Sequence, residues 1–122
     1  MEFKDIVCKI PHPEKPDQNG YIISLESAKN GFSDIKNMPV LYEDIPIGIA
    51  YNSDFLNDEN ASEIYMKVWD KIDIEQKIKD GYTFVPEIMV NEMDGNVIKD
   101  FSIIAMILTN EPAIESYTEI IE

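Results

Sequence analysis

Residues 82–109 read YTFVPEIMVNEMDGNVIKDFSIIAMILT, and this stretch decides the fold class. Two long apolar segments, residues 82–90 and Val97–Thr109, lie on either side of the dipeptide Asp94-Gly95. Glycine tolerates the positive φ that tight hairpin turns require. The stretch therefore predicts an antiparallel hairpin with Asp94-Gly95 at its tip.

A second strand signal comes from residues 63–69, which alternate with period two. The alternation places Ile64, Met66 and Val68 on one face of a strand and Tyr65, Lys67 and Trp69 on the other. The face with Tyr65 and Trp69 is a candidate partner-binding surface, although aromatic faces more often complete a core. Glu43 is the third candidate partner-binding residue.

The rest of the chain reads as short strands, turns and few helices. Strands are expected at residues 3–10, 21–25, 38–42 and 45–51, a helical turn at 27–32, a loop at 52–62, a helix at 70–80 ended by Gly81, and a short helix or edge strand at 111–122. Because strands and helices do not alternate, we expect a mainly β fold with one or two short helices, a small antiparallel β-barrel or sandwich.

One domain is expected over residues 1–122, with residues 11–20 as a proline-rich linker segment. Pro11, Pro13 and Pro16 lie close together, which predicts an extended and exposed segment. His12 is the only imidazole of the chain. It is expected to be a solvated spacer in this linker and not a catalytic base.

The charge of the chain excludes some partners. Among its 122 residues, 24 Asp and Glu face 10 basic residues, all of them Lys, and the net charge is −14. This field repels phosphate, and without Arg the chain has no bidentate contact to phosphate or guanine, so direct binding of nucleic acid is rejected. No apolar run is long enough to span a membrane and the first residues lack a secretion signal, so we expect a cytoplasmic protein without a membrane partner.

Few residues could support catalysis or hold a metal. Cys8 and His12 cannot supply the ligands of a zinc site, and residues 52–63 match a calcium loop poorly because Leu56 occupies a ligand position. Cys8 is read as a small buried hydrophobe. The neighbours Glu43 and Asp44 point apart, which disfavours an acid and base pair. No metal and no cofactor are expected.

Two stretches, taken in order, resemble the prohead (capsid maturation) protease family of tailed bacteriophages. The first is Asn37-Met38-Pro39-Val40-Leu41-Tyr42-Glu43-Asp44-Ile45-Pro46-Ile47-Gly48, which is similar to the family's Met-Pro-hydrophobic-Leu strand, short turn and Pro-Ile-Gly segment. The second begins at Lys79-Asp80-Gly81 and continues through Val97 to Asn110 into Pro112-Ala113, which resembles the family's closing strand. The resemblance implies a small β-barrel with a flanking helix, made by a phage or prophage.

The chain departs from this family at both catalytic positions. Asp44 stands where the catalytic His is expected, Pro86 falls at the position of the nucleophilic Ser, and Thr83 is the nearby hydroxyl. The resemblance therefore implies a protein without catalysis that kept the fold and binds a capsid or scaffold protein during assembly, a role compatible with a homo-oligomer. The alternative is an acidic phage inhibitor that mimics nucleic acid and blocks a basic groove of a host defence or DNA-handling protein.

Overall fold

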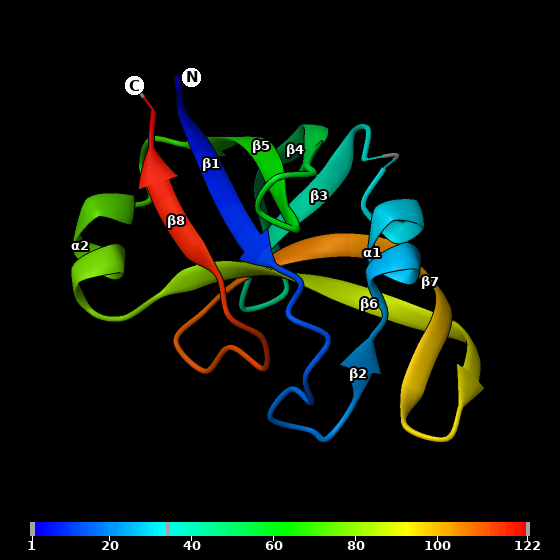
Figure 1. Ribbon diagram of the computed structural model, residues 1–122. Helices are drawn as coiled ribbons and strands as arrows, with labels where there is room; N and C mark the ends of the chain where they lie inside the picture. Colours follow the sequence, from blue (N-terminus) through cyan, green and yellow to red (C-terminus); the bar gives the residue numbers. More distant parts are fainter. Residues whose placement is uncertain (1, 34, 122) are drawn as a thin grey trace.

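Eight strands and two short helices make up residues 2–33 and 35–121, which the computed structural model describes (Figure 1). In chain order they are β1 (Phe3–Pro11), β2 (Ile22–Ile23), α1 (Leu25–Gly31), β3 (Met38–Tyr42), β4 (Ile45–Leu56), β5 (Ala61–Trp69), α2 (Ile74–Lys79), β6 (Thr83–Asp94), β7 (Val97–Thr109) and β8 (Tyr117–Ile120). The strands form one curled sheet, a half-barrel. The predicted mainly β, barrel-like fold with short helices is confirmed.

The strand order of the sheet is β2-β7-β3-β4-β5-β1-β8. β6 lies outside this order and pairs with β7. Most neighbours are antiparallel, but β7 runs parallel to β2 and to β3. These two short parallel contacts are the exceptions to the antiparallel pairing that the sequence predicts. β7 is 13 residues long, so β2 pairs beside its start and β3 near its end, and neither strand is joined to β7 by a hairpin.

β6 and β7 form the hairpin that residues 82–109 predict. Asp94 pairs with Val97, so the two residues of the turn are Gly95 and Asn96. Gly95 has a φ of 62°, a value that glycine adopts at little cost. The predicted hairpin is confirmed, with Asp94 as the last strand residue before the turn.

β5 supplies the centre of the core. Ile64, Met66 and Val68 are fully buried, whereas Lys67 on the opposite face is exposed, as the alternation predicts. Antiparallel pairing with β1 on one side and β4 on the other covers both edges of this strand. The buried side chains form one hydrophobic cluster, which also contains Ile6, Cys8, Ile10, Phe32, Val40, Phe84 and Met106.

Gly48 explains how closely β4 approaches β5. A Cβ at this position would lie 2.2 Å from the Lys67 carbonyl oxygen and 2.9 Å from the Val68 Cα. Both of these atoms belong to the backbone of a central strand and cannot move aside easily. The glycine of the Pro-Ile-Gly segment therefore has a packing role in this fold.

The loop predicted at residues 52–62 is wrong. β4 continues to Leu56 and β5 begins at Ala61, so only residues 57–60 form the connection. Cross-strand hydrogen bonding holds these polar residues in the sheet, and a register shift between Ala50 and Asn52 accommodates them. The Ser53 hydroxyl also donates to the Phe32 carbonyl oxygen at 2.6 Å. Tertiary pairing here overrides the low strand propensity of Asn, Asp and Ser.

The helix predicted at residues 70–80 is shorter than expected. α2 spans Ile74–Lys79, and the residue that caps it is Asp73, whose side chain accepts from the Gln76 amide. Gly81 has a φ of 91° and ends the helix as predicted. Residues 70–73 form a turn instead, because the Asp70 amide donates to the Glu2 carbonyl oxygen at 3.0 Å.

The start of β1 and the end of β8 lie side by side in Figure 1, because β8 pairs antiparallel with β1. The prediction of an edge strand within residues 111–122 is thus confirmed for Tyr117–Ile120, whereas Glu122 lies outside the described residues. The helical turn predicted at residues 27–32 is also present, as α1. Within residues 2–33 and 35–121, no helix is both long and apolar enough to cross a membrane.

Candidate functional site

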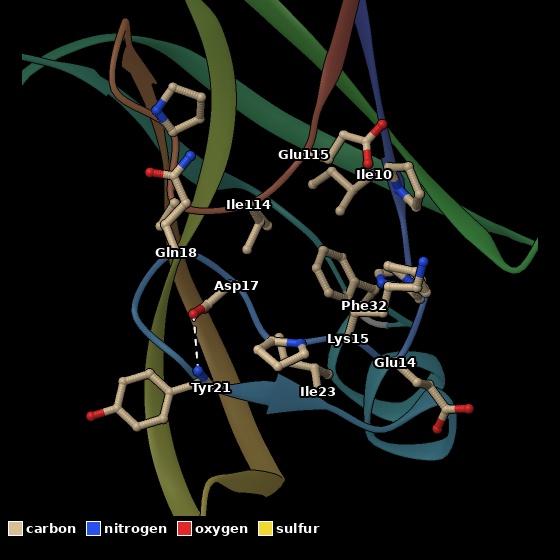
Figure 2. Close-up of a pocket in the computed structure, with 16 residues that line it drawn as sticks. Ile10, Glu14, Lys15, Asp17, Gln18, Tyr21, Ile23, Phe32, Ile114 and Glu115 are labelled. Atoms are coloured by element: carbon tan, nitrogen blue, oxygen red, sulfur yellow. Dashed lines mark hydrogen bonds between the residues drawn. The ribbon is translucent and has the colours of Figure 1, made fainter.

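A cavity of about 490 Å³ opens between residues 10–18, β2 and residues 112–115, and we call it the proline cleft (Figure 2). Its volume lies within the range of roughly 300–1,000 Å³ that ligand pockets occupy. Figure 2 shows Ile10, Phe32 and Ile114 facing one another across the cavity, with Ile23 below them. The interior of the cleft is therefore apolar.

Three different elements position these interior side chains. Ile10 continues the inward alternation of Ile6 and Cys8 along β1. Phe32 caps α1 at its C-terminal end, where its amide donates to the Ala28 carbonyl oxygen. Ile114 comes from the connection between β7 and β8. The cleft thus forms where the end of β1 meets the two irregular segments of the chain.

The rim of the proline cleft is mainly acidic. Glu14, Asp17 and Glu115 stand there with a single lysine, Lys15. The Asp17 carboxylate accepts from the amides of Asn19 at 2.8 Å and Tyr21 at 3.0 Å, which holds the turn before β2. Figure 2 shows the Glu14 side chain turned away from the interior. Three carboxylates and one lysine therefore lie at the edge of an apolar interior.

A second cavity of about 260 Å³ adjoins the proline cleft. Asp17, Tyr21, Ile23, Ala113 and Ile114 line both spaces. The far wall of the second cavity is formed by residues of β6 and β7, namely Val85, Pro86, Ile88, Val90 and Ile98. The backbone amide of Gln18 donates to the Ala113 carbonyl oxygen at 3.1 Å. This hydrogen bond links the segment before β2 to the connection between β7 and β8, beside both cavities.

His12 lies in the wall of the proline cleft, and its prediction as a solvated spacer is wrong. Its side chain is buried, and its Nε2 lies 2.8 Å from the Ser62 hydroxyl. The ring stacks on Phe55 and lies against Phe32. The prediction of an exposed linker is wrong at His12, because Pro11 is still part of β1 and the backbone amide of His12 donates to the Asn60 carbonyl oxygen.

The buried pair of His12 and Ser62 is poorly suited to nucleophilic catalysis. Burial lowers the pKa of His12 from 6.5 to about 4, so the ring is neutral at pH 7 and is a weak base. Ser62 is fully buried and out of reach of a substrate. The pair therefore serves packing and hydrogen bonding in the wall of the cleft.

A cluster of hydroxyl groups joins β8 to the start of β6. The Ser116 hydroxyl donates to the Phe84 carbonyl oxygen at 2.6 Å, and the Phe84 amide donates to the Thr118 hydroxyl at 3.2 Å. Thr83 Oγ1 lies 2.6 Å from Thr118 Oγ1. The hydrogen-bond partners of Thr83 are therefore hydroxyls and a carbonyl, and none of them is a carboxylate or amine that could activate it.

Cys8 belongs to the same cluster and is buried, as its sequence context predicts. Its Sγ lies 3.0 Å from the Ser116 hydroxyl and donates to the Phe84 carbonyl oxygen. Burial raises the pKa of Cys8 from 9.0 to about 12, so the side chain is a thiol at neutral pH. A protonated and buried thiol is chemically inert.

The structure places Asp44 and Pro86 in different settings. Asp44 lies with Glu43 in the turn between β3 and β4, where both have a positive φ. Pro86 lies within β6 opposite Met106 and lines the second cavity. Asp44 is thus an exposed turn residue, and Pro86 is a strand residue without a side-chain nucleophile.

Another cluster, which the sequence reasoning missed, joins α2 to the end of β3 and to the residue before β6. Lys77 Nζ donates to the Tyr42 hydroxyl at 3.1 Å and lies 4.3 Å and 4.7 Å from the ring centres of Tyr42 and Tyr82. The hydrogen bond to Tyr42 raises the pKa of Lys77. No spacing in the sequence indicates this cluster, because Tyr42, Lys77 and Tyr82 come from separate parts of the chain.

The predicted partner face of Tyr65 and Trp69 lies away from the proline cleft. Both side chains are half-buried on the outer face of β5, and the Tyr65 hydroxyl donates to Glu63 at 3.0 Å. Lys71 Nζ lies 5.3 Å from the Trp69 ring. Neither residue, nor Glu43, lines either cavity. The concentration of prolines at residues 11–16 was the signal that could have indicated the cleft.

Neither metal-ligating side chains nor comparison with known proteins assigns a function to the described residues. Across residues 2–33 and 35–121, His, Cys, Asp and Glu side chains form no group of three that could hold a metal ion. Comparison of the chain with protein-family models, curated proteins and solved structures gives no match.

Proposed function

We propose that this chain is a non-catalytic phage or prophage protein with a prohead-protease-like fold, which binds a capsid or scaffold protein during assembly in the host cytoplasm. The resemblance of residues 37–48 and 79–113 to that family supplies the class of partner. The observation that carries the proposal is the proline cleft, an apolar cavity of about 490 Å³ with an acidic rim.

The chemistry of the cleft supports binding without catalysis. His12, the only imidazole of the chain, is neutral and hydrogen-bonded to a fully buried serine. Thr83 is held by Thr118 and Ser116 at the junction of β6 and β8. A covalent mechanism needs a nucleophile beside a base with access to substrate, and these side chains are engaged elsewhere.

The direct test is a calorimetric titration of the purified chain with the capsid and scaffold proteins encoded by the same phage or prophage. Ile114 lines both cavities from a loop, so Ile114→Asp should place a charge in the binding site without removing a strand residue. We expect it to weaken binding at least about tenfold, which is typical for the loss of a central apolar contact.

Ile45→Asp is the matched control, because Ile45 is 62% exposed and lines neither cavity. This variant should bind like the wild type. The proposal fails if neither capsid nor scaffold protein binds the wild-type chain at concentrations of about 100 μM, or if both aspartate variants bind equally well.

A further inference from the structure

The proline cleft and the second cavity adjoin, and we call the two together the groove. Ile23 and Ile114 line both spaces, whereas Phe32 lines the proline cleft alone and Val90 of β6 lines the second cavity alone. A compact ligand would fill only one of the two spaces. The shared lining instead suits an extended chain that places one apolar side chain in each cavity.

The edge of β6 beside the groove is open to a further strand. At Phe84 the amide and carbonyl are already bonded to the hydroxyls of Thr118 and Ser116. Beyond this point, and among the described residues, β6 has β7 as its single strand partner. Residues 87–90 of β6 therefore offer main-chain groups to an extended segment beside the second cavity, whereas Pro86 has no N–H and offers its carbonyl alone.

The charge of the groove selects the occupant. Glu14, Asp17 and Glu115 line the proline cleft, where the Glu14 carboxylate accepts from the Leu25 amide at 2.9 Å, and exposed Glu87 and Glu92 lie on β6 outside the lining of both cavities. A second copy of the chain would bring the same carboxylates and a further net charge of −14 to this surface. Charge complementarity therefore favours a segment that carries Lys or Arg.

We propose that the groove receives an extended segment of the partner protein in which apolar side chains alternate with small polar ones and are flanked by basic residues. This inference rests on the proposed function and names the chemistry of the partner's docking segment. The apolar side chains occupy the two cavities, the basic residues pair with the acidic rim, and the main chain of the segment extends β6.

The test uses the full chain and a synthetic peptide of sequence Lys-Lys-Leu-Thr-Leu-Thr-Phe-Lys-Lys, with a second peptide that has Glu in place of each Lys. Binding is followed by calorimetry, and hydrogen exchange of residues 86–94 is followed by mass spectrometry. The basic peptide should bind, slow the exchange of these residues, and bind at least about tenfold tighter than the acidic peptide.

Two pairs of variants separate the apolar and charged contributions. Ile114→Asp should abolish peptide binding, whereas Ile45→Asp should not. Glu115→Lys at the rim should weaken binding about threefold to tenfold, whereas Glu119→Lys, an exposed residue of β8 outside both cavities, should leave it unchanged. The four variants are compared at the same salt concentration because the charged contribution is screened.

The inference is overturned if the acidic peptide binds as tightly as the basic one, if the exchange of residues 86–94 does not slow, or if the chain dimerises through the groove in sedimentation experiments. Absence of peptide binding overturns it too. These outcomes leave the proposed function open to its own test, because titration with the intact capsid or scaffold protein reports binding by any surface of the partner.

Discussion

His12 Nε2 lies 2.8 Å from Ser62 Oγ, and both side chains are buried beside the proline cleft. This contact connects the end of β1 with the start of β5 through side chains. Burial of the His12 ring also makes folding depend on pH, because the buried ring has a pKa of about 4 whereas an unfolded chain has one near 6.5.

The contribution of His12 to stability should be complete above pH 6.5 and should fall as the pH is lowered towards 4. In this window the unfolded chain binds a proton that the folded chain does not bind, so acid favours unfolding. The loss should reach roughly 2 kcal/mol at about pH 4.5. Urea unfolding at pH 7 and pH 4.5 measures it.

His12→Gln is the control for this prediction. The relief of repulsion among carboxylates at low pH acts on both proteins, so the difference between wild type and His12→Gln isolates the histidine. If the difference in unfolding free energy between wild type and His12→Gln is the same at pH 7 and at pH 4.5, His12 is not buried in its neutral form.

Gly48→Ala should destabilise the fold by about 3 kcal/mol, because the added Cβ collides with the backbone of β5. Chemical denaturation measures the free energy of unfolding. Asn52→Ala, an exposed position on the same strand, is the control and should change stability by less than about 0.5 kcal/mol. Equal stability of the two variants would mean that β4 and β5 are not so closely packed.

Thr118→Val should loosen the junction between β6 and β8. It removes the acceptor of the Phe84 amide and should cost about 1–3 kcal/mol. Cys8 lies in the same cluster, so iodoacetamide should alkylate the wild-type thiol only after unfolding and should react faster with the variant. Rapid alkylation of the native wild-type chain at pH 8 would contradict this arrangement.

Duplex DNA should not bind to the chain at physiological salt. The net charge of −14 repels phosphate, and the basic residues are outnumbered by 24 acids. Fluorescence anisotropy with a labelled duplex over a range of salt concentrations tests this. Micromolar affinity that falls steeply with added salt would refute the prediction.

Local patterns in the sequence were sufficient for the regular parts of the fold. The alternation from Ile64 to Val68 reports burial on one face, and Gly95 in the hairpin turn reports a backbone with positive φ. Both are local properties. Residues 52–56 gave no such signal, because their strand is fixed by pairing with β5 and not by their own propensity.

The candidate site was less predictable than the fold. The prolines of residues 11–16 indicate irregular backbone, but the cleft exists only because the segment packs beside Ile114, which lies about a hundred residues further along the chain. The burial of His12 likewise depends on Phe32, Phe55 and Ser62 from other elements. Neither the cleft nor the burial of His12 produces a periodic pattern in the local sequence.

We propose that the chain binds a capsid or scaffold protein without cleaving it. Incubation with these proteins, followed by sedimentation for complex formation and by mass spectrometry for the length of each polypeptide, tests both parts together. The account predicts a complex in which every polypeptide keeps its full mass. Absence of a complex, or cleavage by the wild-type chain that disappears in Thr83→Ala, would contradict it.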